Sequence, residues 1–169
     1  MDLSTVIDVL SVIAVVIGLF YAGLELRQFR ISRERESALE LFKTFQSLEF
    51  MRGVRLIPEL PDNQSREQIE NLAGERIDDL YFTIASLEGL GVLVHREELS
   101  LGLVEDFFSG IIVTTWLKLR RFVEDERKAL DRQTWGEWTQ WLAERIIERE
   151  KTNPPVPANI EYQNWKPKS

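Results

Sequence analysis

The sequence predicts an all-α protein in which an N-terminal transmembrane helix continues into a cytoplasmic bundle of about four to five helices. Three observations lead to this prediction. Residues 3–24 are almost wholly apolar, and a spanning helix needs ~20 such residues to cross ~30 Å of hydrocarbon. Later segments repeat their apolar residues with helical spacing. No segment alternates apolar and polar residues for long enough to indicate a β-strand.

The apolar segment at residues 3–24 is expected to be an uncleaved anchor. Its one charge, Asp8, lies close enough to the start to reach the headgroup level. A cleaved signal peptide would carry positive residues before its apolar core, whereas this chain begins with acidic ones. Lys and Arg follow the segment and none precedes it, so we expect the N-terminus to lie outside the membrane and everything from about Glu25 onward to lie in the cytoplasm. A buried helix of a soluble protein is the alternative.

Two sets of residues near the predicted anchor are candidates for contacts. Small residues recur every fourth position at Ala14, Gly18 and Ala22, a spacing that lets helices approach closely in lipid. The alternative is that such residues are simply common in membrane spans. Four basic residues follow the anchor and are expected to face anionic lipid of the bilayer: Arg27, Arg30, Arg33 and Arg35.

Residues 25–57 contain no proline and one glycine, Gly53, so we expect the anchor to continue as one helix until Pro58. Apolar residues occur at every seventh position along it. This spacing indicates either pairing with a sister chain or packing on the other helices of the domain. The positions are Leu24, Ile31, Ala38 and Phe45.

The bundle itself is predicted over residues 58–152, and its first helices follow a proline-rich turn. Ser65 and Gln68 form a capping box, which predicts a short helix to about Ala73. Apolar residues then recur at helical spacing over 75–94, which predicts an amphipathic helix.

The remaining elements are two longer helices and a tail. Ser100 is expected to cap a helix over residues 101–129. Thr134 and Glu137 form a second capping box, which predicts a helix to about Lys151. Residues 153–169 are proline-rich and are expected to be extended.

Composition and motifs exclude most chemistry. The chain has no cysteine and a single histidine, His95, so thiolate zinc sites and histidine-carboxylate metal pairs are not expected. No phosphate-binding loop and no nucleophile motif occurs. The net charge of −7 disfavours nucleic acid as a partner. We therefore expect no catalytic residue, no cofactor, no metal and no enzymatic activity.

Glu88 is a candidate buried polar residue, because it shares a face with Tyr81 and Ile84. A buried carboxylate needs a partner. The candidates are Arg96, Arg120, Arg121 and Arg127. The functional interpretation is a polar switch or ligand contact, and the alternative is an ion pair that fixes the register of two helices.

Three tryptophans, Trp135, Trp138 and Trp141, are spaced by three residues and predict an aromatic stripe on the last helix. Tryptophan is enriched at the centres of protein interfaces, so this stripe is a candidate groove for a partner. The alternative is packing against the core.

Several short segments together resemble a family of small bacterial membrane-anchored helical proteins that is defined as a domain of unknown function. The segments are 17–22 (IGLFYA), 26–28 (LRQ), 45–50 (FQSLEF), 60–62 (LPD), 88–94 (EGLGVLV), 116–119 (WLKL) and 137–145 (EWTQWLAER). The resemblance covers roughly residues 10–148. It implies a bacterial inner-membrane protein and brings no catalytic residue with it.

Three functions remain open on the sequence alone. The first is a membrane-tethered interaction or regulatory module, which binds a protein partner or self-associates. The second is an accessory subunit of a larger membrane complex, such as a channel, a transporter or a defence effector. The third is a small-ligand sensor or enzyme with a pocket lined by Glu88, Arg96 and the tryptophans.

Overall fold

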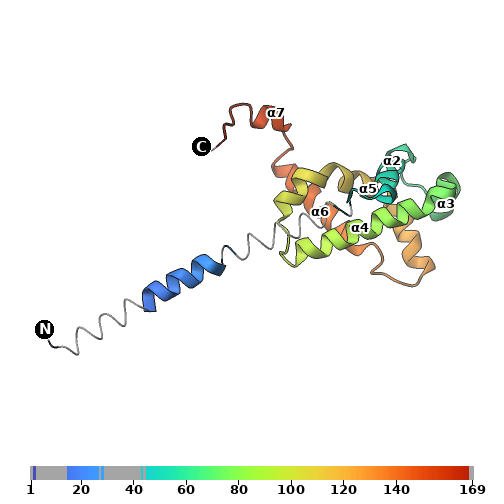
Figure 1. The fold of residues 1–169 in the computed structure, drawn as a ribbon. Helices are drawn as coiled ribbons and strands as arrows, with labels where there is room; N and C mark the ends of the chain where they lie inside the picture. Colours follow the sequence, from blue (N-terminus) through green and yellow to red (C-terminus); the bar gives the residue numbers. More distant parts are fainter. Residues whose placement is uncertain (1, 3–14, 27, 29–42, 44, 168–169) are drawn as a thin grey trace. The chain divides into compact units, whose positions relative to one another are not determined.

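The computed structural model describes residues 2, 15–26, 28, 43 and 45–167. The chain divides into two compact units, residues 1–43 and 44–169, and each is described by itself. Every regular element within the described ranges is helical (Figure 1).

The first unit contains a helix at residues 15–26, drawn in blue in Figure 1. In the parts of the chain that are described, no helix is both long enough and apolar enough to cross a membrane. The predicted transmembrane anchor and the single-pass inner-membrane localisation are therefore wrong, although residues 3–14 of that anchor lie outside the described residues.

The two contact sets predicted around the anchor lie only in part on residues that the structure describes. Gly18 lies on the described helix, and a Cβ built on it would meet no atom within 4 Å. Ala22 lies on the same helix and is exposed. Ala14 and the four candidate lipid-binding arginines, Arg27, Arg30, Arg33 and Arg35, lie outside the described residues.

The second unit is a bundle of five α-helices with short additions. Its elements are α2 (Leu48–Glu59), α3 (Arg66–Ala73), the 3-10 turn η1 (Gly74–Arg76), α4 (Ile77–His95), α5 (Leu101–Ala129), α6 (Glu137–Thr152) and the short α7 (Ala158–Glu161).

The helix predicted to run unbroken from residue 25 to 57 is interrupted at Ser47. Ser47 has extended backbone angles, and its hydroxyl accepts a hydrogen bond from the backbone N–H of Phe50. A serine side chain that bonds to a nearby backbone N–H competes with a continuous helix. The helix α2 therefore begins anew after Ser47. Pro58 lies in the last turn of α2 rather than beyond it. Residues 29–42 of the predicted helix lie outside the described residues.

Two of the predicted caps are confirmed, and one is wrong. Ser65 and Gln68 form the reciprocal capping box of α3, and the Ser100 hydroxyl caps α5. The helix α6, however, starts after Gly136, which has a left-handed φ of 68° and cannot supply a side chain to cap it. Thr134 lies outside the helix and makes no side-chain cap.

The core lies among α2, α4, α5 and α6. The helix α4 packs against α2 on one side and α6 on another, and α5 also contacts α2, α3 and α6 (Figure 1). The largest fully buried side chains come from all of these helices: Phe50, Leu56, Ile57, Ile69, Leu80, Leu87, Leu90, Ile112, Leu119, Phe122, Leu142 and Ile146.

The contact between α2 and α4 depends on a glycine. A Cβ added at Gly53 would collide with Thr83 Oγ1 and with the backbone carbonyl of Asp79. The Thr83 hydroxyl is itself fixed, because it donates to that same carbonyl over 2.9 Å. The two helices therefore approach so closely at this point that only glycine fits.

Candidate functional site

The helix α4 is apolar on all sides. Between Asp79 and His95 its only charged residue is Glu88. Its inward face is buried through Leu80, Thr83, Ile84, Leu87, Leu90, Gly91 and Val94.

A second row of residues runs along the outward face of α4. At 100° per residue its members fall within a sector of about 80°. We call this row the outer stripe, and its residues are Asp78, Phe82, Ala85, Gly89, Leu93 and Arg96. Leu93 is partly exposed and the other five are exposed, with Phe82 at 37%.

Glu88 connects α4 to α6. Its Oε1 accepts a hydrogen bond from the backbone N–H of Thr139 over 2.5 Å. Thr139 is the third residue of α6, and the N-cap residue Gly136 has no side chain to satisfy that amide. The Glu88 carboxylate therefore caps α6 from a neighbouring helix, where negative charge also favours the positive end of the helix dipole.

The expected arginine partners of Glu88 are not its partners. The nearest predicted one in sequence, Arg96, lies at the C-cap position of α4 and is exposed. Arg127 donates instead to the Trp135 carbonyl over 2.8 Å and to Gln140 Oε1 over 2.9 Å. The structure thus favours the structural interpretation of Glu88, with a backbone amide in place of the arginine.

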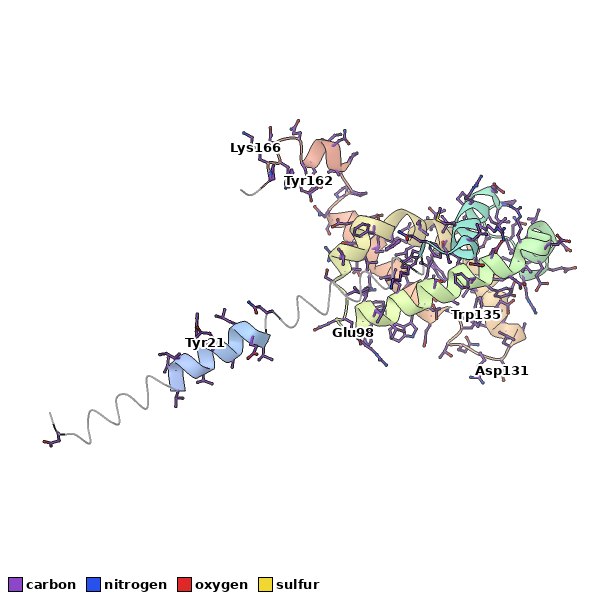
Figure 2. The ribbon with its side chains drawn as sticks, viewed as in Figure 1. Tyr21, Glu98, Asp131, Trp135, Tyr162 and Lys166 are labelled. Carbon is purple, nitrogen blue, oxygen red and sulfur yellow. The ribbon has the colours of Figure 1, made fainter. Side chains whose placement is uncertain are left out.

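A cavity of about 540 Å³ lies beside Glu88. Its walls come from α4 and from the connection between α5 and α6, through Ile84, Ala85, Glu88, Leu130, Arg132, Thr134, Trp135 and Gly136. Figure 2 shows Asp131 at the outer end of that connection and Trp135 closer to α4. Since Ala85 also belongs to the outer stripe, the cavity opens next to it.

The three tryptophans do not form one stripe. Trp135 precedes α6, and its ring centroid lies 6.1 Å from that of Tyr81 and 6.0 Å from that of Phe122. Trp138 and Trp141 lie on α6 and pack around the His95 ring, at centroid distances of 4.9 Å and 5.8 Å. All three indoles are partly exposed.

Trp138 is held against α4 by a second close contact. A Cβ on Gly91 would lie 2.7 Å from the Trp138 carbonyl oxygen and 2.8 Å from its Cβ. The neighbouring Gly89 differs, because a Cβ built on it would meet nothing within 4 Å. Close packing therefore accounts for Gly91 but not for Gly89.

The most buried carboxylate of the domain was missed by sequence reasoning. Glu126 is 2% exposed, and its Oε1 accepts from the Tyr81 hydroxyl over 2.6 Å and pairs with Arg66 Nε at 2.8 Å. These contacts join α3, α4 and α5. The signal was available, because Glu126 continues the apolar row of α5 one turn beyond Phe122 and Val123.

This network changes the acidity of Tyr81. Burial, followed by the hydrogen bond to Glu126 and the charge of that carboxylate, raises the pKa of Tyr81 from 10.0 to about 12. The tyrosine is therefore a stable donor at neutral pH. Through Tyr81, Glu126 and Arg66 the network connects α4, α5 and α3 and supports their packing.

The outer stripe ends in two charged residues of opposite sign. Within the described part of the chain, neither Asp78 nor Arg96 makes a side-chain hydrogen bond or ion pair. No group of three or more His, Cys, Asp or Glu in the same part could hold a metal ion. The middle of the outer stripe is uncharged, and each of its two ends carries one charge. Such a surface is suited to non-covalent recognition.

Comparison with known proteins gives one match. A family profile described as "Domain of unknown function (DUF4760)" matches residues 9–146. No curated protein and no solved structure matches the chain.

Proposed function

We propose that this chain, which belongs to the DUF4760 family of domains of unknown function, is an interaction module that binds a protein through the outer stripe of α4. This proposal keeps the interaction role inferred from the sequence and drops the membrane tether. The bacterial origin implied by the resemblance remains part of the proposal.

The single observation that carries the proposal is the exposed apolar surface of the outer stripe. Phe82 and Leu93 flank two small residues, Ala85 and Gly89, and no charged side chain interrupts them. Contiguous apolar patches larger than roughly a few hundred Å² are uncommon on monomeric proteins and mark interaction sites when they occur. Small residues at the centre allow the backbone of another helix to come close.

The cavity beside Glu88 adds a recess to this surface. Interface energy concentrates where one or two side chains of a partner fill a desolvated pocket next to a flatter contact. Trp135 and Leu130 provide an apolar wall, and Arg132 supplies a charged rim. An apolar side chain of a bound protein would fit between them.

The proposal is tested by photo-crosslinking in the full chain. A photoreactive residue is placed at Ala85, in the outer stripe, or at Leu72 as a control, since Leu72 is an exposed apolar residue on α3. We expect a protein adduct from position 85 and none from position 72. The absence of any adduct at position 85, or equal adducts at both positions, would refute the proposal.

A second candidate, a small-ligand sensor, is favoured by the volume of the cavity. Sites for small molecules typically measure ~300–1,000 Å³, and this cavity measures about 540 Å³. A thermal-shift screen of the full chain tests it. A true ligand should lose its effect in Ala85→Trp, which fills the cavity from an exposed position, whereas a shift that persists would place the ligand elsewhere.

A further inference from the structure

We propose that the protein bound by the outer stripe is a second copy of this chain, paired antiparallel through α4 about a two-fold axis at the level of Leu87. This inference rests on the proposed function, because it names the partner of the same surface. It commits to an arrangement in which each residue of the stripe has a defined counterpart in the second copy.

The first argument is the order of residue types along the outer stripe. Read in either direction, the stripe presents a charge, a large apolar residue, a small residue, a small residue, a large apolar residue and a charge. Asp78 and Arg96 lie equally far from Leu87 along the chain, as do Ala85 and Gly89, whereas Phe82 and Leu93 differ by one residue in their separation from it. A two-fold axis requires a surface that complements itself in this way.

The second argument is electrostatic. In the antiparallel arrangement Asp78 of one copy lies at the level of Arg96 of the other, and the pair occurs twice. Neither side chain has a partner within the described part of its own chain. The antiparallel arrangement also sets each helix N-terminus beside the C-terminus of the other helix, which favours the two helix dipoles.

The third argument is steric. Where the two helices would cross, each contributes Ala85 and Gly89, and a Cβ on Gly89 would meet nothing within 4 Å of its own chain. Two helices can approach to ~8 Å when small residues lie at the crossing. Phe82 then packs against Leu93 of the second copy on both sides of the crossing.

The fourth argument concerns net charge. A chain of net charge −7 repels a second copy over most of its surface. The outer stripe is an exception, because Asp78 and Arg96 cancel and Glu88 is bound to the α6 amide. Two copies can therefore meet on α4 without adding like charges.

The size of the contact sets the strength that we expect. A single pair of helices buries less area than the ~1,600 Å² of a standard stable interface. We therefore expect a reversible dimer whose population rises with protein concentration. Sedimentation velocity of the full chain over a series of protein concentrations is the measurement.

A charge exchange tests the antiparallel arrangement. Asp78→Arg alone sets arginine against arginine, and Arg96→Asp alone sets aspartate against aspartate. We expect each variant to dissociate at least tenfold more readily than the unmodified chain. An equimolar mixture restores both opposite-sign contacts, so a 1:1 dimer of the two variants is expected. Failure of the mixture to associate better than either variant would overturn the arrangement.

A steric variant tests the crossing without changing charge. Gly89→Leu adds a side chain where the free chain has open space, so it should leave the fold intact and abolish the dimer. The control is Gly110→Leu on α5, since Gly110 is also an exposed helical glycine with nothing within 4 Å of its added Cβ. Equal dimerisation of both variants would overturn the proposal.

The adduct captured at position 85 separates this inference from the proposed function. An adduct of the chain with itself, together with loss of the dimer in Gly89→Leu, supports both. An adduct with a different protein, together with a monomer at every concentration, overturns the second copy and leaves the interaction module standing. No adduct at all overturns both.

Discussion

The inward and outward faces of α4 both carry apolar residues, yet they differ in what surrounds them. On the inward face, Thr83 meets Gly53 of α2, and Gly91 meets Trp138 of α6. On the outward face, Gly89 meets nothing within 4 Å. Gly89 and Gly91 lie on the same helix, less than one turn apart, and therefore have opposite steric surroundings.

The comparison shows that contact, rather than hydrophobicity, distinguishes a core face from an unpartnered one. The inward face is fixed by backbone contacts and by Glu88, which caps α6. The outward face also carries apolar residues, Phe82, Ala85 and Leu93, but they are exposed or partly exposed. Five substitutions, taken from the largest expected effect to the smallest, test this difference.

Gly53→Ala should destabilise the domain most. The added Cβ collides with Thr83 Oγ1 and the Asp79 carbonyl, and the backbone carbonyl cannot turn away. Overpacking of this kind costs about 3 kcal/mol. Urea denaturation of the full chain measures it, and an unchanged midpoint with an unchanged slope would show that α2 and α4 are not in close contact here.

Gly91→Ala should destabilise by about 2 kcal/mol, within the range of overpacked cores. Its Cβ would lie 2.7 Å from the Trp138 carbonyl oxygen, so α6 has to move away from α4. The indole fluorescence of Trp138 and Trp141 beside His95 should change with it. A variant as stable as the parent, with the same fluorescence, would contradict the α4–α6 contact.

Tyr81→Phe should cost about 1.5 kcal/mol at neutral pH, because it removes a hydrogen bond to a buried carboxylate. The unfolded chain loses this proton near a pKa of 10.0 and the folded chain near about 12. The native state therefore holds the proton more strongly, and its stability falls as the pH rises from 10 to 12. We expect this alkaline slope to be shallower in Tyr81→Phe, and an identical slope would refute the assignment.

Glu88→Ala should cost about 1 kcal/mol, the typical effect of removing a helix cap. The Thr139 amide loses its acceptor, so its hydrogen exchange should accelerate more than that of residues in the middle of α6. Glu124→Ala on α5 is a matched control, since Glu124 is an exposed glutamate. Equal effects of the two variants would mean that the carboxylate of Glu88 does not act as a cap.

Gly89→Ala should have the smallest effect and the opposite sign. Alanine is the better helix former, and the added Cβ meets no atom, so we expect a gain of about 0.5 kcal/mol in the free energy of unfolding. Thermal unfolding at low concentration measures it without dimer. Destabilisation would show that the outward face is covered within the chain.

Local signals predicted the helices well where they depended on neighbouring residues alone. Ser65 and Gln68 cap α3 as expected, and Ser100 caps α5, because each cap is closed within one turn. The same reasoning failed at α6. The pair Thr134 and Glu137 fits a capping box in sequence, but the chain turns at Gly136 and α4 supplies the cap instead.

The partners of charged residues were harder to predict, because they depend on how helices pack. Glu88 was expected to pair with an arginine, and its acceptor role toward a backbone amide leaves no trace in sequence. Glu126 could have been found from its place in the apolar row of α5, yet its partner Arg66 comes from a different helix.

The prediction of a membrane span failed for a different reason. Apolar composition at residues 3–24 meets the length rule for a membrane span, and the prediction depended on that composition alone. The described helix covers residues 15–26, and no described helix meets the requirement.

The cap that α4 provides for α6 gives the domain an order of assembly. A ribosome releases the chain amino end first, so Glu88 emerges well before Thr139. The helix α6 has no cap of its own at Gly136, and short isolated helices are marginal in water. During synthesis α6 therefore gains this cap only once it meets α4, whose Glu88 has left the ribosome earlier.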